Sequence, residues 1–243
     1  MCVAFLFRGG KMDFGNITKE YFYKTELHAH TSPASGCADF SPEEVMKTYA
    51  AAGVHSVVIT NHLTPEYVSK RGDEYLDDYY RAKRAGEELG VNAILGVEIR
   101  FKENNNDYLV FGVTDDDVRN MTGYLEGGLH DFYKEFKRED NLIIQAHPFR
   151  KHIVQIDPSD IDGYESFNLH PGHNSGVGFS SKLVKDTAKL ATCGTDYHHF
   201  GHEAMALLRT KDVLRDSFDV VKAIKSRDYL FDVWGHIVYP YGN

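Results

Sequence analysis

Short apolar runs that each lead into a histidine or a carboxylate recur along this chain, and this pattern limits its fold more than any other feature. Such runs precede His62, Glu98, His147 and Asp196, with helical segments between several of them. A strand, a helix and a second strand in that order form a right-handed parallel unit. Repetition of the unit predicts an α/β fold, a closed or nearly closed β/α barrel, in which the strand ends share one face.

Two histidines separated by one residue lie in the stretch 26–31. We expect a strand from Phe22 to Ala29, and side chains alternate along a strand, so His28 and His30 would project from the same face. An isolated pair of this kind is usually a surface feature of an edge strand. A second close pair, Asp196 and His198, makes a shared metal site the better interpretation.

Helix and strand signals follow in order along the chain. Ser41 is a suitable N-cap, Pro42 fits the first helical position, Glu44 completes a capping box, and Gly53 ends the helix. The other expected strands cover residues 56–60, 92–97, 108–113, 142–146, 161–167, 192–195 and 229–233. The other expected helices cover residues 73–89, 115–140 with a break at 127–128, 180–189 and 218–226.

Length and composition favour one ordinary globular domain. The chain has 243 residues, of which 42% are hydrophobic and 26% charged, enough for one large core. We expect a single domain over 1–243, with residues 1–20 as a peripheral segment and a core from about 22 to 235. The formal charge of −9 argues against a nucleic-acid-binding surface, since phosphate backbones require basic partners.

The cysteines and the apolar stretches of the chain indicate the cellular compartment in which the protein is expected. Cys2, Cys37 and Cys193 are widely spaced, without a CxxC motif, so no disulfide framework is implied and a reducing cytoplasm is expected. The apolar run 2–7 is too short for a secretory signal with a cleavage site, and no stretch is long enough to span a membrane. The oligomeric state is left open.

The histidines and carboxylates at the expected strand ends form one candidate metal centre. The set is His28, His30, His62, Glu98, His147, Asp196 and His198. Each residue alone could be a hydrogen-bonded core group, but together they would be costly to bury unless divalent cations shared their lone pairs. Mixed nitrogen and oxygen ligands favour zinc, manganese or iron, and their number favours two or three ions.

Five ordered motifs resemble those of the PHP (polymerase and histidinol phosphatase) family. They are His28-Ala-His-Thr31, Ile59-Thr-Asn-His62, Gly96-Val-Glu98, Ala146-His-Pro148 and Gly194-Thr-Asp-Tyr-His198. The resemblance covers residues 22–235. It implies a distorted (β/α)7 TIM-like barrel of PHP type, up to three metal ions, and hydrolysis of a phosphate ester by metal-bound hydroxide. It also implies that the seven residues above are metal ligands.

The sequence departs from the family pattern in places. A ligand position before the Ser41 helix start is occupied by Cys37, with Asp39 nearby, and another position, usually histidine, is occupied by Asp107. A thiolate or a carboxylate can coordinate a metal, so the resemblance extends the expected ligand set to Cys37 and Asp107. Asn61 replaces an aspartate that could have oriented His62.

Substrate contacts are expected beyond the metals. Arg150, three residues after His147, is the best-placed arginine to bind a phosphate, although it could instead pair with an acidic residue of the same rim. Loop histidines at 170, 173, 199 and 202 could bind substrate or protonate the leaving group, or simply be exposed. We select His173 and His202 as substrate-binding candidates.

We therefore predict a metal-dependent phosphoesterase that acts on a small-molecule phosphate ester. A metal-dependent amidohydrolase-like enzyme that cleaves a C–N or ester bond is the second hypothesis, although no lysine near the motifs is placed to bridge metals as a carbamate. A non-catalytic, metal-stabilised module is the third. Retention of nearly every ligand position argues against the third.

Overall fold

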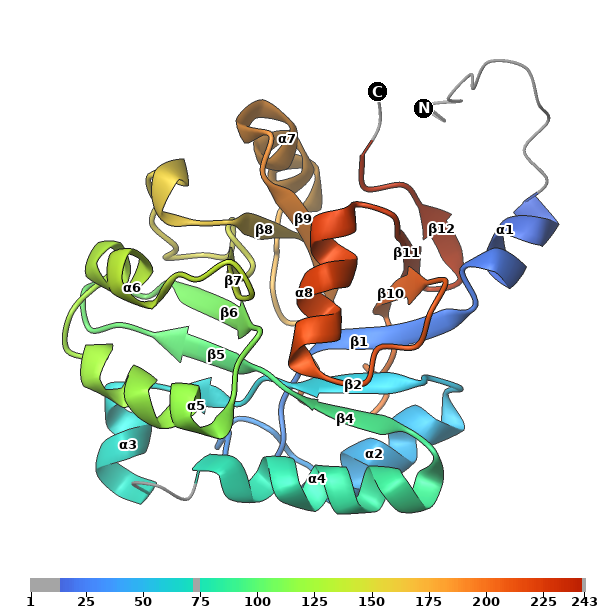
Figure 1. Cartoon of the computed structure of the whole chain (residues 1–243), viewed down its shortest axis with the longest axis horizontal. Helices are drawn as coiled ribbons and strands as arrows, with labels where there is room; N and C mark the ends of the chain where they lie inside the picture. The colour runs from blue at the N-terminus through green and yellow to red at the C-terminus, as the bar shows by residue number, and fades with distance from the viewer. Residues whose placement is uncertain (1–13, 72–74, 242–243) are drawn as a thin grey trace.

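The computed structural model describes residues 14–71 and 75–241, which form an α/β fold around two mixed six-stranded sheets (Figure 1). One sheet has the order β12-β11-β10-β1-β2-β4 and the other the order β3-β5-β6-β7-β8-β9. The strands are β1 (Tyr23–Ala29), β2 (Ser56–Ile59), β3 (His62–Leu63), β4 (Asn92–Leu95), β5 (Val97–Arg100), β6 (Asp107–Phe111), β7 (Leu142–Gln145), β8 (Gly163–Asn168), β9 (Leu190–Gly194), β10 (Ala206–Thr210), β11 (Leu230–Val233) and β12 (His236–Val238).

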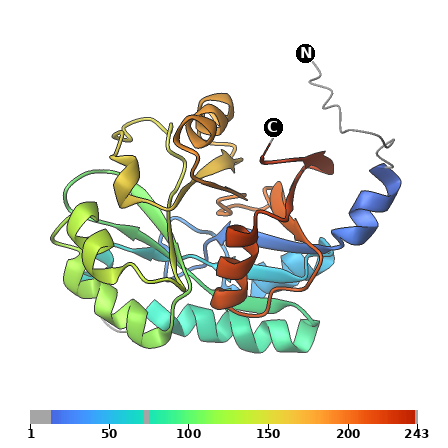
Figure 2. The same ribbon diagram turned by 45° about the horizontal axis from the view of Figure 1, so that its top comes forward.

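Helices pack around these sheets. They are α1 (Phe14–Glu20), α2 (Pro42–Ala51), α3 (Pro65–Arg71), α4 (Tyr75–Leu89), α5 (Asp115–Met121), α6 (Leu129–Phe136), α7 (Val177–Thr187) and α8 (Ser217–Ser226), with short 3₁₀ turns at Thr122–Tyr124 and Pro158–Asp160. Helices α2 and α4 pack against each other below β2 and β4, and α7 lies at the opposite end of the molecule (Figures 1 and 2). Helix α1 extends from the edge of the fold, and the expected helix start at Asp73 and residues 1–13, including Cys2, lie outside the described residues.

The first predicted unit is confirmed. Strands β1 and β2 pair in parallel, with α2 between them in the chain. The side chain of Ser41 accepts a hydrogen bond from the Glu44 amide, and the Glu44 carboxylate accepts one from the Ser41 amide, which is the predicted capping box. These contacts satisfy amide groups at the start of α2 that have no partner within the helix.

The sheets are less parallel than the repeated unit predicts. Strand β6 pairs antiparallel with both β5 and β7, and β10 pairs antiparallel with β1. Only residues 101–106 connect β5 to β6, and this link is too short for a parallel crossover, so a hairpin forms. The predicted strand over residues 92–97 also divides at Gly96 into β4 and β5, and Glu98 lies within β5 and not beyond it. A Cβ at Gly96 would come within 2.6 Å of Val58 Cγ1, so only glycine fits where the two sheets meet.

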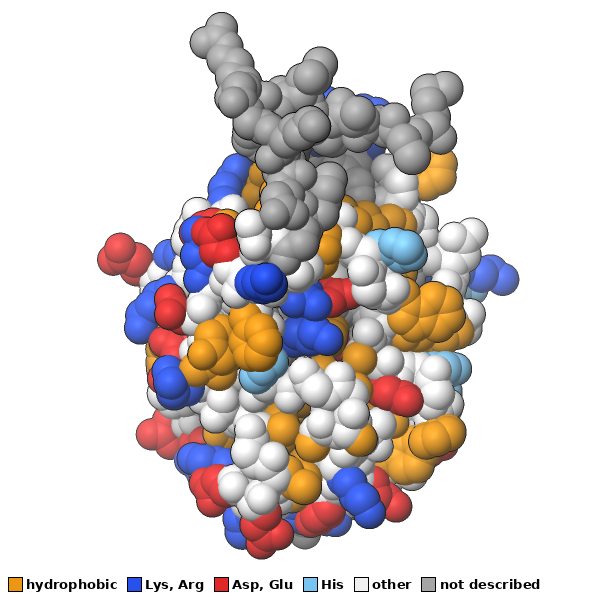
Figure 3. Space-filling model, turned by 90° about the vertical axis from the view of Figure 1, so that its right-hand side faces the viewer, with side chains coloured by type: hydrophobic (Ala, Val, Ile, Leu, Met, Phe, Trp, Pro, Cys, Tyr) orange, Lys and Arg blue, Asp and Glu red, His pale blue; other side chains and the backbone are white. Residues whose placement is uncertain are grey.

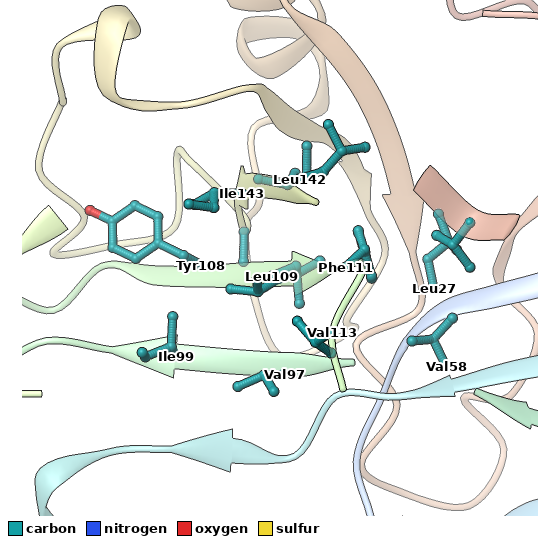
Figure 4. Packing of buried hydrophobic residues seen from close by; sticks show 14 of the residues in the cluster. Leu27, Val58, Val97, Ile99, Tyr108, Leu109, Phe111, Val113, Leu142 and Ile143 are labelled. Carbon is teal, nitrogen blue, oxygen red and sulfur yellow. The ribbon is translucent and has the colours of Figure 1, made fainter. Parts of the chain in front are cut away.

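The main core lies between the strands of the two sheets. Leu27 and Val58 from one sheet and Val97, Leu109 and Phe111 from the other belong to the same buried cluster (Figure 4). A smaller cluster, which includes Met46 and Tyr49 of α2, lies below β1 and β2. Both clusters hold the strands in fixed positions, which is the condition for presenting polar groups at the strand ends accurately.

One face of the outer surface carries side chains of both charges. On the face drawn in Figure 3, the side chains of Lys, Arg, Asp and Glu are interspersed with hydrophobic ones. Among the described residues, no helix combines the length and the apolar character needed to cross a bilayer.

Candidate metal centre

Histidines and carboxylates from distant parts of the chain converge at one buried point. His28 belongs to β1 and His30 directly follows it, His62 belongs to β3 and Glu98 to β5, whereas His147 follows β7 and Asp196 follows β9. All of these residues are buried except His62, whose side chain is 22% exposed. The structure therefore brings together residues that the sequence separates by more than a hundred positions.

Glu98 lies at the centre of this cluster. Its Oε1 is 3.3 Å from His28 Nε2 and 3.2 Å from His147 Nε2. Its Oε2 is 3.3 Å from His30 Nε2 and 2.8 Å from His62 Nδ1. One carboxylate thus faces four imidazoles, an arrangement that suits a ligand shared between cations.

Asp196 closes the opposite side of the cluster. Its Oδ1 is 3.4 Å from His28 Nε2 and 3.3 Å from both His30 Nε2 and His198 Nδ1. The Asp196 backbone has φ of 56°, a left-handed conformation that aspartate tolerates better than most residues. This backbone turn directs the carboxylate toward β1.

Contacts behind the histidines determine which ring nitrogen faces the cluster. His28 Nδ1 is 2.9 Å from Glu165 Oε1, and His30 Nδ1 is 3.1 Å from Ser35 Oγ. The Ser35 hydroxyl already donates to Asn61 Oδ1, so its oxygen must accept the proton of His30 Nδ1. His30 therefore presents an unprotonated Nε2 to the centre, as a metal ligand must, and the contact with Glu165 leaves Nε2 as the nitrogen of His28 that faces the centre.

Several atoms of the cluster lack the hydrogen bonds that their burial requires. Among the described residues, the buried atoms without such a partner include His28 Nε2, His30 Nε2, His62 Nδ1 and Glu98 Oε2. Native proteins rarely leave buried polar atoms unsatisfied. In three groups of residues, one ligand atom from each member lies within 4.8 Å of those of the other members. The groups are His28, His30 and Asp196; His30, His62 and His198; and His62, Glu98 and Asp107. These donor sets fit divalent transition metals.

The electrostatics of the cluster favour ionised carboxylates. Burial alone would raise the pKa of Glu98, but the neighbouring His28 and His62 hold it well below its ordinary value, and the pKa of Asp196 is also lowered despite burial, chiefly by His28. Burial and the nearby His198 and His62 lower the pKa of His30 well below its usual range. Burial also opposes the charged form of His28, but the carboxylates of Asp196, Glu165 and Glu98 raise its pKa well above the usual value. The two carboxylates are thus ionised and His30 is neutral, whereas His28 holds a proton that a bound cation would displace.

Cys37 lies at the edge of the cluster. Its Sγ is 3.1 Å from His198 Nε2. Partial burial raises the pKa of the thiol, but hydrogen bonds with His198 and His62 outweigh it and bring the pKa to about 6. The thiolate is the form that binds metals, so the geometry is compatible with the predicted ligand role.

Asp107 is close to the cluster but is engaged by two arginines. Arg100 Nε and Nη2 lie 2.6 and 2.7 Å from its two oxygens, and Arg150 Nη2 lies 2.8 Å from Oδ2. His147 Nε2 is farther from the same oxygen, at 3.7 Å. The predicted alternative for Arg150, an ion pair with an acidic residue of the rim, is therefore present in this structure.

A cavity of about 410 Å³ opens above the cluster. Its lining residues are Cys37, His62, Glu98, Arg100, His147, Arg150, His170, His173, Asp196, His198 and His199. His173 Nδ1 is 3.5 Å from Asp196 Oδ2, so this predicted substrate-binding residue borders the cluster. His202 does not line the cavity, and its ring lies 6.1 Å from that of His170. A second cavity of about 570 Å³ shares His62 and Arg100 with the first.

Sequence reasoning missed three residues of this site. Ser35 lies in an irregular loop and carried no recognisable signal. Glu165 lies within an expected strand but in none of the motifs, and it accepts hydrogen bonds from the backbone amide of His147 and the side-chain amide of Asn168 as well as contacting His28. Arg100 could have been found, because it follows Glu98 by two positions on the same strand and so faces the same side.

Comparison with known proteins identifies the family. A model of the PHP domain matches residues 26–241, so the chain belongs to the PHP domain family. No curated protein sequence matches the chain. Similar solved structures include a candidate metal-dependent phosphoesterase of Bifidobacterium adolescentis, at 17% identity and a TM-score of 0.52, which covers 84% of this chain and 96% of that one.

Two further structures share the fold. A two-domain protein of Bacteroides vulgatus contains a predicted PHP-like metal-dependent phosphoesterase, and it matches at 13% identity and a TM-score of 0.64 over 87% of this chain and 64% of that chain. An amidohydrolase of Chromobacterium violaceum with bound sulfate and no metal matches at 12% identity and a TM-score of 0.54 over 89% of this chain and 98% of that one. At such identities the likeness extends to the fold alone.

Proposed function

We propose that this chain is a metal-dependent phosphoesterase that hydrolyses a small-molecule phosphate ester. The single observation that carries the proposal is the buried cluster around Glu98, in which imidazole nitrogens and a carboxylate oxygen without hydrogen-bond partners converge below an open cavity. Such a cluster is costly to maintain unless cations neutralise it, and the cavity gives a substrate access to those cations.

The proposed ligands are His28, His30, His62, Glu98, His147, Asp196 and His198, with Cys37 beside them. Two or three zinc, manganese or iron ions would acidify a bound water and offset the negative charge of the phosphoryl oxygens. Glu165 and Ser35 orient the rings of His28 and His30, and thereby keep their Nε2 lone pairs directed at the ions.

The remaining residues of the cavity have roles on the substrate side. Arg150 is charged at any working pH and lines the cavity, so it can hold a phosphate oxygen. His173, next to Asp196, is placed to contact the substrate or its leaving group. We assign His202 a weaker role at the rim, since it approaches His170 and His199 and not the cluster itself.

Other aspects of the account belong to the same proposal. The two sheets would close into the distorted (β/α)7 barrel expected for the family, through the parallel bridge between Ala29 and Tyr197. The chain would act as one PHP domain on a small molecule in a reducing compartment such as the cytoplasm, in keeping with the free thiols of Cys37 and Cys193.

An amidohydrolase-like reaction is the second candidate, because one protein of similar fold is described as an amidohydrolase. Against it, no lysine is found among the described residues that line the 410 Å³ cavity, so none is placed to bridge metals as a carbamate. A purely structural metal site would not require an open cavity with two arginines in its wall.

The test is a substrate panel. The protein would be loaded separately with manganese, zinc and iron and assayed on phosphomonoesters, phosphodiesters, carboxylic esters and amides. We expect hydrolysis of phosphate esters. A chelator should abolish this activity, and addition of the metal ion should restore it. Hydrolysis of amides or carboxylic esters alone would favour the second candidate, and no turnover of any substrate would favour a non-catalytic role.

A further inference from the structure

Arg100 and Arg150 approach the same buried carboxylate from different parts of the chain. Arg100 is the last residue of β5, and Arg150 lies in the loop after β7. Together they donate three short hydrogen bonds to Asp107, whose side chain is fully buried. Two guanidinium groups around one carboxylate leave one net positive charge in a wall otherwise lined by the anionic Glu98 and Asp196.

The arginines retain donors that the protein does not use. Within the described residues, no hydrogen bond is made by Arg100 Nη1 or by Arg150 Nε and Nη1. Both side chains are partly exposed, at 34% for Arg100 and 21% for Arg150, and both line the cavity above the metal cluster. The carboxylate holds each guanidinium in place on one side, and the free N–H groups on the other side can donate parallel hydrogen bonds to two oxygens of a phosphate.

The same contacts weaken Asp107 as a metal ligand. A carboxylate offers about four lone-pair sites, and three of those of Asp107 already accept charge-assisted hydrogen bonds. A divalent ion at the remaining site would lie beside two guanidinium groups, and like charges repel strongly in a partly desolvated site.

We propose that Arg100 and Arg150 form a paired site for the phosphate group of the substrate, and that Asp107 positions these two arginines and does not bind a metal. This inference rests on the proposed function and deepens it, because it adds a second arginine and defines a tetrahedral oxyanion as the group recognised. Arg100 also borders the neighbouring 570 Å³ cavity, so the rest of the substrate would extend from the phosphate into that space.

The experiment measures two quantities on the metal-loaded protein: ions per chain by elemental analysis, and the affinity for inorganic phosphate by calorimetry. The variants are Arg100→Gln, Arg150→Gln and Asp107→Asn. The control is Arg138→Gln, because Arg138 forms a comparable two-bond pair with Asp117, and neither residue lines the metal-site cavity. Circular dichroism would verify that each variant is folded.

Each arginine variant is expected to keep its metal and to bind phosphate about tenfold or more weakly, which is the effect of losing a charge-assisted hydrogen bond. Asp107→Asn is expected to keep the wild-type number of ions, and Arg138→Gln to match wild type in both measurements. Wild-type phosphate affinity in both arginine variants, or loss of about one ion per chain in Asp107→Asn, would overturn the inference.

The arginine variants leave Asp107 in place, so they decide the matter if Asp107→Asn does not fold. Ester hydrolysis with no dependence of phosphate affinity on the arginines would refute this inference and leave the proposed function standing. Arginine-dependent phosphate binding without turnover of any ester would refute the proposed function and leave the anion site standing.

Discussion

Replacement of Ser35 by alanine tests whether the contacts behind the histidines prepare the metal site. Ser35 Oγ donates to Asn61 Oδ1 at 2.9 Å and accepts from His30 Nδ1 at 3.1 Å and from the His62 amide at 3.0 Å. Ser35 is only 1% exposed, so water cannot readily replace the lost hydroxyl. Alanine would leave the proton of His30 Nδ1 and the amide of His62 without partners.

The expected magnitudes follow from these contacts. A buried donor left without a partner costs about 1–3 kcal/mol, so the loss of two partners, with some relaxation, predicts a fall of about 2–4 kcal/mol in the free energy of unfolding of the metal-free protein. The ring of His30 would no longer be held with its Nε2 toward Asp196 and Glu98. Loss of such an orienting contact typically weakens metal binding about 10- to 100-fold.

The assay pairs urea unfolding with metal competition against a chelator of known affinity. Ser217→Ala is the matched control, because Ser217 is also buried and its Oγ accepts hydrogen bonds from the amides of Gly112 and Val113, remote from the metal cluster. Both variants should lose stability, and only Ser35→Ala should lose metal affinity. Equal metal affinity in Ser35→Ala and wild type would refute the claim that Ser35 orients His30.

Asp196→Asn should abolish turnover without unfolding the protein, because asparagine tolerates the left-handed backbone at this position but lacks the charge; substantial remaining activity would place the chemistry elsewhere. Cys37→Ser should lower the number of bound ions, and bound metal should slow alkylation of Cys37 in the wild type; unchanged metal content would make Cys37 a bystander. Gly36→Trp should obstruct the 570 Å³ cavity and raise KM for bulky esters, with no change in phosphate affinity. The control Gly123→Trp should leave both KM and phosphate affinity unchanged, and at both glycines an added Cβ would meet nothing within 4 Å.

Local periodicity made much of the site predictable. The alternation of side chains on a strand predicted that His28 and His30 would share a face, and their ring centroids lie 5.0 Å apart. The meeting of His62, His147 and Asp196 followed from their positions after apolar runs. The family itself was recognisable from these motifs and is confirmed over residues 26–241.

Long-range pairing was less predictable. The order of elements suggested parallel strands throughout, whereas β5, β6 and β7 pair antiparallel and β10 was not foreseen. The short link over residues 101–106 was the available signal for the hairpin, because a parallel crossover needs about a dozen residues or more. Ser35 could not be assigned from the sequence, since its role depends on how a loop places it between Asn61 and His30.

The most direct test of the account is the metal content of the protein purified without chelators, measured by elemental analysis of the transition metals. The convergent ligand groups around Glu98 and Asp196 predict two or three ions of zinc, manganese or iron for each chain. No more than trace metal, with no uptake when these ions are supplied, would contradict the central claim that the cluster is a metal centre.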